Sequence, residues 1–292
     1  MQYTSVHELV LLAENTGLSM GELVLKDQSK QGEVAPQVLF DNMKKALQVM
    51  KQSVETGLDP DKRSISGLTG GDAYKMHKAV CEGRNICGSV FGNALTKALA
   101  TSQTNACMGK IVAAPTAGSC GILPAAILTI AEDRKLDDDA LTYALFSASA
   151  IGLVIANCAS ISGAEGGCQA ECGAASAMAG AALVELCGGT PKQMEHACAI
   201  ALKNILGLVC DPVAGLVEIP CIKRNAAGVA NALVAAELAL AGIESAIPAD
   251  EVIWAMNKVG KAMSTAFKET AEGGLAITPT GKKLCAQVFG ES

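Results

Sequence analysis

Residues 202–225 read LKNILGLVCDPVAGLVEIPCIKRN, a stretch in which glycine, proline and small polar residues interrupt a helical pattern. Cys210 precedes an Asp-Pro pair, and Cys221 follows a proline at the predicted start of another helix. Thiolates are favoured near helix starts, where the backbone dipole is positive and a metal can reach the sulfur. The stretch therefore predicts a fold in which helices are joined by Gly-rich loops that carry chemistry.

Three more Gly-rich stretches interrupt helical patterns: Gly67–Asp72 (GLTGGD), Ala114–Pro124 (APTAGSCGILP) and Ser160–Gly173 (SISGAEGGCQAECG). The last two run directly into predicted helices, whose free N–H groups suit a carboxylate or a phosphate. A tight turn between helices that merely needs glycine explains either loop equally well. None of the stretches has the Walker A or the Rossmann pattern.

Helix signals dominate the rest of the chain. Ser5 and Ser19 each precede a glutamate at capping-box spacing, and Thr190 precedes Pro191 at a third predicted helix start. No convincing alternation of β-branched and polar residues predicts a strand. We expect helices near residues 5–15, 19–30, 34–56, 72–82, 88–101, 122–134, 137–156, 168–187, 191–206, 222–242 and 249–269.

The predicted fold class is therefore all-α: a compact multi-helix catalytic domain whose Gly-rich loops converge on one site. Its 292 residues can bury a sizeable core without disulfides. We expect a single domain over residues 1–292. The polar segment 58–71 could separate a smaller N-terminal helical region, residues 1–57, from the main body.

Composition excludes several classes of protein. The net charge is −6, which provides no basic surface for nucleic acid. Residues 140–164 carry no charge, but they contain several serines and end in a Gly-rich loop, so a buried core helix is favoured over a membrane span. The first ten residues lack the pattern of a signal peptide, so we expect a cytoplasmic protein with reduced cysteines.

The twelve cysteines include no C-x-x-C pair, so a cluster would need widely spaced ligands. Cys168 opens a predicted helix after a double glycine and joins Cys210 and Cys221 as a residue at an element boundary. Cys172 lies one helical turn later and stays open as a ligand, whereas Cys285 reads as an incidental thiol in a C-terminal tail. Six others lie in apolar helical patterns and are expected in the core: Cys81, Cys87, Cys107, Cys158, Cys187 and Cys198.

Other catalytic groups are scarce. His7, His77 and His196 all lie outside the Gly-rich stretches, which argues against a histidine-based metal site. No Gly-x-Ser-x-Gly elbow is present to support a hydrolase triad.

Taken together, the motifs resemble those of a known family. Gly67–Asp72, Pro115–Pro124, Ser160–Glu171, Leu202–Asn225 and Glu269–Ala276 (ETAEGGLA) are similar to segments of the α chain of the two-chain, iron–sulfur-dependent L-serine dehydratases of bacteria. The resemblance covers essentially the whole chain.

This resemblance implies a [4Fe–4S] cluster held by Cys168, Cys210 and Cys221, with one iron open to L-serine as a Lewis acid. Elimination of water then leads to pyruvate and ammonia, a step in amino-acid degradation that can feed gluconeogenesis. The catalytic base is expected on a separate β chain, so the enzyme would be a hetero-oligomer. The resemblance further implies that Cys285 is a possible counterpart of a C-terminal cysteine that caps the open iron in single-chain relatives. The implied substrate-binding residues are Thr69, Gly70, Gly71, Thr116, Gly118, Ser119, Lys203 and Asn204.

Three alternatives remain at this stage. An L-cysteine desulfidase could use a related cluster domain with sulfide as the leaving group. A non-catalytic cluster or redox-sensor subunit would bind a fully ligated cluster. A helical assembly subunit with core cysteines would bind no iron. A pyridoxal-phosphate enzyme is disfavoured because no lysine has a distinctive Gly/Ser-flanked context.

Overall fold

Helix α9 (Ala174–Leu186) runs through the middle of the molecule and is buried along nearly its whole length. Its sequence, AASAMAGAALVEL, is mostly alanine and glycine, so neighbouring helices approach its backbone closely. α6 (Ile122–Arg134), α7 (Asp138–Cys158), α10 (Pro191–Lys203) and α11 (Cys221–Leu240) all pack against it. The hydrophobic core is therefore built around a central helix of small side chains, against which larger residues such as Phe146 and Ile151 of the neighbouring helix α7 are buried.

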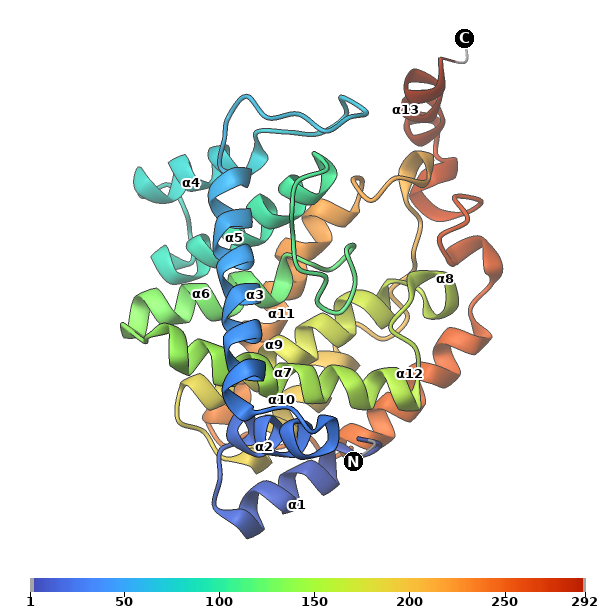
Figure 1. The fold of residues 1–292 in the computed structure, drawn as a ribbon. Coiled ribbons are helices and arrows are strands. Elements are labelled where there is room, and N and C mark those ends of the chain that lie inside the picture. Colours follow the sequence, from blue (N-terminus) through green and yellow to red (C-terminus); the bar gives the residue numbers. More distant parts are fainter. Residues whose placement is uncertain (1–2, 291–292) are drawn as a thin grey trace.

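The computed structural model describes residues 3–290, which form no β-strand. Figure 1 shows α1 and α2 at one end of the molecule, α4 and α5 at the other, and α13 projecting beside the C-terminus. The remaining helices are α1 (Val6–Thr16), α2 (Met20–Gly32), α3 (Pro36–Gly57), α4 (Asp72–Cys81), α5 (Gly88–Ala106), α8 (Gly163–Gly166), α12 (Ala249–Ala262) and α13 (Pro279–Phe289), with a π-helical segment η1 (Gln169–Gly173) and 3-10 segments η2 (Val213–Gly215), η3 (Thr265–Phe267) and η4 (Gly274–Ile277).

The predicted helix starts are confirmed. Ser19 accepts a hydrogen bond from the Glu22 amide at 3.2 Å, and the Glu22 carboxylate accepts one from the Ser19 amide at 3.0 Å. Thr190 forms the same reciprocal pair with Gln193. These bonds satisfy amides that have no partner within the helix, and they fix where α2 and α10 begin.

The prediction of a C-terminal tail around Cys285 is wrong. Residues 279–289 form α13, and Cys285 lies half-buried on it. Thr278 caps this helix by accepting from the Gly281 amide at 3.1 Å, and Pro279 occupies its first position. This is the same Thr-Pro start signal that the sequence shows at residues 190 and 191.

The prediction that six cysteines pack in the core holds for Cys198, which is fully buried in α10. It is wrong for Cys81 and Cys87, which are exposed, and Cys107, Cys158 and Cys187 are only partly buried. The reason is positional, because all five lie at the end or the cap of a helix, where the apolar face leaves the core.

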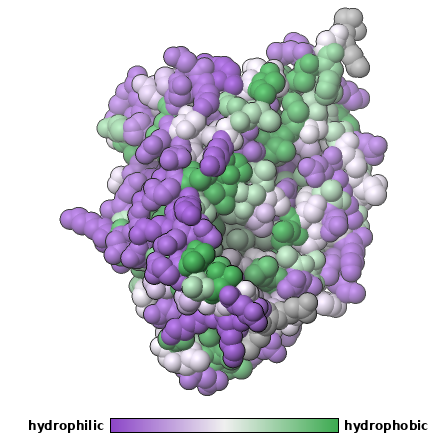
Figure 2. All heavy atoms as spheres, viewed as in Figure 1, coloured by the Kyte–Doolittle hydropathy of each residue, from purple (hydrophilic) through white to green (hydrophobic). Residues whose placement is uncertain are grey.

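The uncharged stretch after residue 140 falls in α7, which is long and apolar enough to cross a membrane. Of the most apolar 18-residue part of this helix, 67% is buried inside the protein. Helices α2, α3 and α9 pack against α7. This placement favours the core-helix interpretation. On the outer surface, Figure 2 shows polar residues over much of one flank and hydrophobic residues gathered around a hollow in the middle of the face.

The N-terminal helices are joined closely to the rest. A Cβ atom added at Gly57, the last residue of α3, would overlap the carbonyl group of Ala100 in α5. The backbones of these two helices therefore touch, and only glycine allows that distance.

We expect Gly57→Ala to lower the free energy of unfolding by about 1–3 kcal/mol, because the added methyl group forces α3 and α5 apart. Chemical denaturation followed by circular dichroism measures this change. Gly32→Ala is the matched control: Gly32 is the last residue of α2, and its added Cβ would meet only Val34 at an ordinary 3.7 Å. Equal stability of the two variants would contradict the packing argument.

Candidate metal centre

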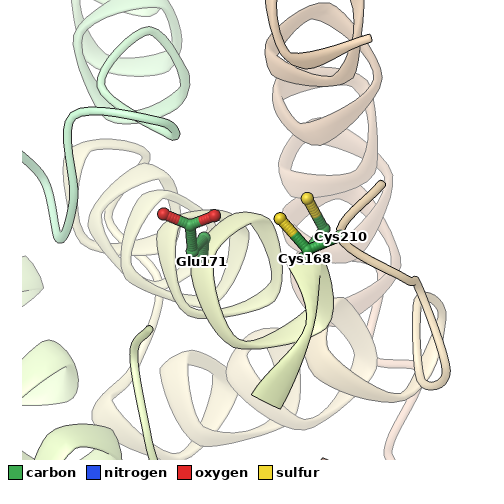
Figure 3. Close-up of side chains that lie close together, drawn as sticks. All are labelled: Cys168, Glu171 and Cys210. Carbon is green, nitrogen blue, oxygen red and sulfur yellow. The ribbon is translucent and has the colours of Figure 1, made fainter. Parts of the chain in front are cut away.

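Cys168 and Cys210 lie side by side and face the carboxylate of Glu171 (Figure 3). The two sulfur atoms and one carboxylate oxygen all lie within 4.8 Å of one another, a spacing that can hold a metal. Cys168 is 2% exposed and Cys210 3% exposed, so the sulfur atoms are nearly removed from solvent. Cys221, at the first position of α11, is 9% exposed and interacts electrostatically with Cys168.

Local backbone geometry explains how Cys168 reaches this point. Gly167 has a φ of 76° and packs so tightly that an added Cβ would lie 2.9 Å from the Leu208 carbonyl oxygen. The Gln169 amide donates to that same oxygen at 2.9 Å, and its side-chain oxygen accepts from the Gly207 amide at 2.9 Å. The third and fourth Gly-rich stretches are therefore hydrogen-bonded to each other through Gln169, the residue after Cys168, and packed against each other at Gly167.

Cys210 is held by a segment whose predicted structure was different. The sequence predicts a helix through residue 269, but α12 ends at Ala262. The chain then turns, so that the Phe267 carbonyl accepts from the Cys210 amide at 2.8 Å and the Glu269 amide donates to the Cys210 carbonyl at 2.9 Å. The helix ends early because this backbone pairs with the cysteine loop.

The thiols at this site differ in the direction in which their pKa values are shifted. Hydrogen bonds from Cys172 and Cys210, together with the guanidinium of Arg224, lower the pKa of Cys168. The same hydrogen bonds raise the pKa of Cys172 and of Cys210, and burial adds to the effect. Burial, followed by the negative charge of Cys168, raises the pKa of Cys221 to about 12.

These surroundings fit a metal cluster. Several buried thiols at close range cannot all lose their protons unless a cation compensates the negative charge. Soft thiolates are also the ligands that iron–sulfur clusters require, and metal binding deprotonates them outright. Cys168, Cys210 and Cys221 could therefore hold such a group, with Glu171 beside it.

Glu171 is a buried carboxylate at this site that the sequence patterns did not single out. Thr116 donates a hydrogen bond to it at 2.6 Å, and an added Cβ at Gly118 or Gly163 would press against its carboxylate at 3.0 and 2.7 Å. Burial is the main cause that raises the pKa of Glu171 to about 7, and the charge of Cys168 contributes. Its position three residues after Cys168, on one helical turn, was the available signal.

The predicted loop residues around Thr69 reach the cysteine loop indirectly. The Thr69 hydroxyl donates at 2.7 Å to Glu218, which lies three residues before Cys221. Gly70 and Gly71 have φ values of 151° and 75° and lead into the N-terminus of α4. A surface pocket of about 620 Å³ adjoins these loops and is lined in part by Glu218.

The second predicted loop contacts the centre more closely. Thr116 touches Glu171, and the Ser119 hydroxyl lies 3.2 Å from that of Thr116. Asn225 donates to the Gly118 carbonyl at 2.7 Å and accepts from the Gly121 amide at 2.8 Å. The second, third and fourth Gly-rich stretches therefore meet around the cysteines, and the first is bonded to the fourth through Glu218.

Lys203 and Asn204 are directed elsewhere. The Lys203 ammonium group donates to the Ser245 hydroxyl at 3.1 Å, and the Asn204 amide donates to Asn231 at 2.9 Å. Their assignment to substrate binding stays a prediction from family resemblance. Cys120, in the second loop, is fully buried, and burial raises its pKa to about 12, as expected of a packing residue.

Comparison with known proteins agrees with this geometry. Residues 15–276 match the family described as "Serine dehydratase alpha chain". This chain belongs to that family. Among serine dehydratase relatives, it is 48% identical to the probable L-serine dehydratase alpha chain of Bacillus subtilis over 288 residues, which cover 99% of this chain and 96% of that protein. It is 43% identical to the L-serine dehydratase alpha chain of Peptoniphilus asaccharolyticus over 280 residues, 96% of each chain. The L-serine dehydratase TdcG of Escherichia coli is 36% identical over 286 residues, which cover 94% of this chain but 62% of that longer protein.

We expect Asn225→Asp to lower the free energy of unfolding by about 1–3 kcal/mol for each buried group left unsatisfied. The Asn225 amide donates hydrogen bonds to two carbonyl oxygens, those of Gly118 and Cys221. An aspartate carboxylate at this position has no N–H group, so both hydrogen bonds would be lost. Urea denaturation measures the loss. Asn231→Asp, on the same helix and only partly buried, should cost less, and the reverse order would contradict the proposed role of Asn225 in joining the loops.

Proposed function

We propose that this chain is the cluster-bearing subunit of a cytoplasmic L-serine dehydratase, which eliminates water from L-serine and releases pyruvate and ammonia. The observation that supports the proposal is the group of buried cysteines where Gly-rich loops meet, in a member of the serine dehydratase alpha chain family. Cys168, Cys210 and Cys221 would be the protein ligands of a [4Fe–4S] cluster.

Held by these three thiolates, a [4Fe–4S] cluster would supply an iron that lacks a protein ligand and could serve as a Lewis acid for the serine hydroxyl. The surrounding residues of the chain bind and orient the substrate. Backbone amides of the loops around Thr69 and Thr116 are suited to the substrate carboxylate because glycine lets an anion approach them closely. Glu171, held by Thr116, presents a carboxylate to the same space.

The base that removes the α-proton is proposed to come from a partner β chain. The three histidines of this chain lie elsewhere: His7 faces Glu195, His77 faces Cys81, and His196 accepts from the Ser245 amide. They belong to α1, α4 and α10, and none of them is in a Gly-rich stretch. The active enzyme is therefore proposed to be a hetero-oligomer.

The cluster assignment predicts a selective loss of iron. After anaerobic reconstitution, the wild-type chain should contain about four irons, the number in a [4Fe–4S] cluster, and L-serine should change its electron paramagnetic resonance signal. Cys168→Ala, Cys210→Ala and Cys221→Ala should each lose most of the iron and acid-labile sulfide. Cys198→Ala is the control, because Cys198 is equally buried but lies in the core of α10.

A wild-type chain without iron after careful reconstitution would reject the proposal. Iron that stays in all three variants would reject the ligand assignment. Release of sulfide from L-cysteine faster than pyruvate from L-serine would identify a desulfidase instead.

The partner assignment predicts a difference in rate. The reconstituted chain alone should bind L-serine but turn it over far more slowly than the complex with its β chain, because it lacks the base. Pyruvate formation measured with and without the β chain tests this point. Equal rates would show that this chain carries the whole active site.

A further inference from the structure

Arg224, on α11 three residues after Cys221, contacts the proposed ligand Cys168. Its Nη1 atom donates to the Cys168 sulfur at 3.4 Å and to the Val209 carbonyl oxygen at 2.8 Å. Its Nη2 atom donates to Asp211 at 2.8 Å. The side chains of Arg224 and Asp211 are 16% and 4% exposed, so solvent screens this pair little.

Asp211 is itself held by the C-terminal segment. Its second carboxylate oxygen accepts from the Leu275 amide at 2.8 Å. Gly274 has a φ of 59°, and a Cβ added there would lie 2.7 Å from the Asp211 Cβ. Gly274 of the ETAEGGLA motif, which neither the ligands nor the substrate loops account for, is therefore needed for this turn to close over Asp211.

We infer that Arg224 is a positioning residue for Cys168 as a cluster ligand, and that Asp211 and the Gly274–Leu275 turn hold Arg224 in that position. The inference rests on the proposed cluster. A guanidinium donates its hydrogen bonds along fixed directions. The bonds to Val209 and Asp211 can therefore hold the Arg224 side chain in place while a third bond orients the Cys168 sulfur. Outer partners of this kind set ligand orientation and tune the metal.

The hydrogen bonds of Arg224 also affect the proposed cluster. Three of them go to protein atoms, and one of these three is donated to the Cys168 sulfur. That hydrogen bond withdraws electron density from the thiolate, which favours the reduced cluster and raises its reduction potential.

The test uses anaerobically reconstituted chain in complex with its β chain. Arg224→Lys, Asp211→Asn and Gly274→Ala are compared with wild type for the rate of iron loss to a ferrous chelator and for the midpoint potential of the cluster. All three should lose iron faster, by about 10- to 100-fold for Arg224→Lys, and should have lower potentials. Lys223→Gln is the charge control, because its side chain is 70% exposed and pairs with Asp72.

The outcomes are distinct. If wild type binds no iron, the proposed function fails and this inference fails with it. If wild type binds iron and Arg224→Lys and Asp211→Asn keep its rate of iron loss and its potential, the inference alone is wrong. A lower melting temperature without a change in potential would assign Arg224 a purely structural role and would also overturn it. If Arg224→Lys does not fold, Asp211→Asn and Gly274→Ala decide the question.

Discussion

The burial of several thiols at one point is the constraint on which the rest of the site depends. Cys168, Cys172 and Cys210 lie within hydrogen-bonding range, and a negative charge on one raises the pKa of the others. These thiols can therefore all lose their protons only if positive charge compensates them. Arg224 supplies one such charge, and the proposed cluster would supply the rest. The surrounding loops must therefore be shaped around sulfur and charge, rather than around an apolar core.

Small residues make this arrangement possible. Alanine and glycine along α9 let four helices pack around one axis, so their connecting loops emerge close together. At the loops, Gly118 and Gly163 leave space for the Glu171 carboxylate, and Gly167 lets the chain pass beside Leu208. The low aromatic content, 3% of the chain, is consistent with a fold that depends on close backbone approach.

Sequence patterns predicted local features well where the signal is local. The capping residues Ser19 and Thr190 lie at the starts of α2 and α10, and two of the three cysteines at element boundaries, Cys168 and Cys210, lie side by side. The patterns failed where distant backbone intervenes. The helix predicted through residue 269 ends at Ala262 because the following segment pairs with Cys210. Cys81 and Cys87 follow an apolar pattern but lie outside the core.

The helical class, the positions of most helix starts, the family and the set of candidate ligands follow from the amino-acid sequence alone. These depend on neighbouring residues, on motif spacing and on residue type, all of which can be read along the chain. Tertiary packing was needed to bring Glu171 to Cys168 and Cys210, and to link Cys168 through Arg224 and Asp211 to Leu275. Those contacts join residues as far as 64 positions apart, and the burial that gives them their strength exists only after the helices have packed.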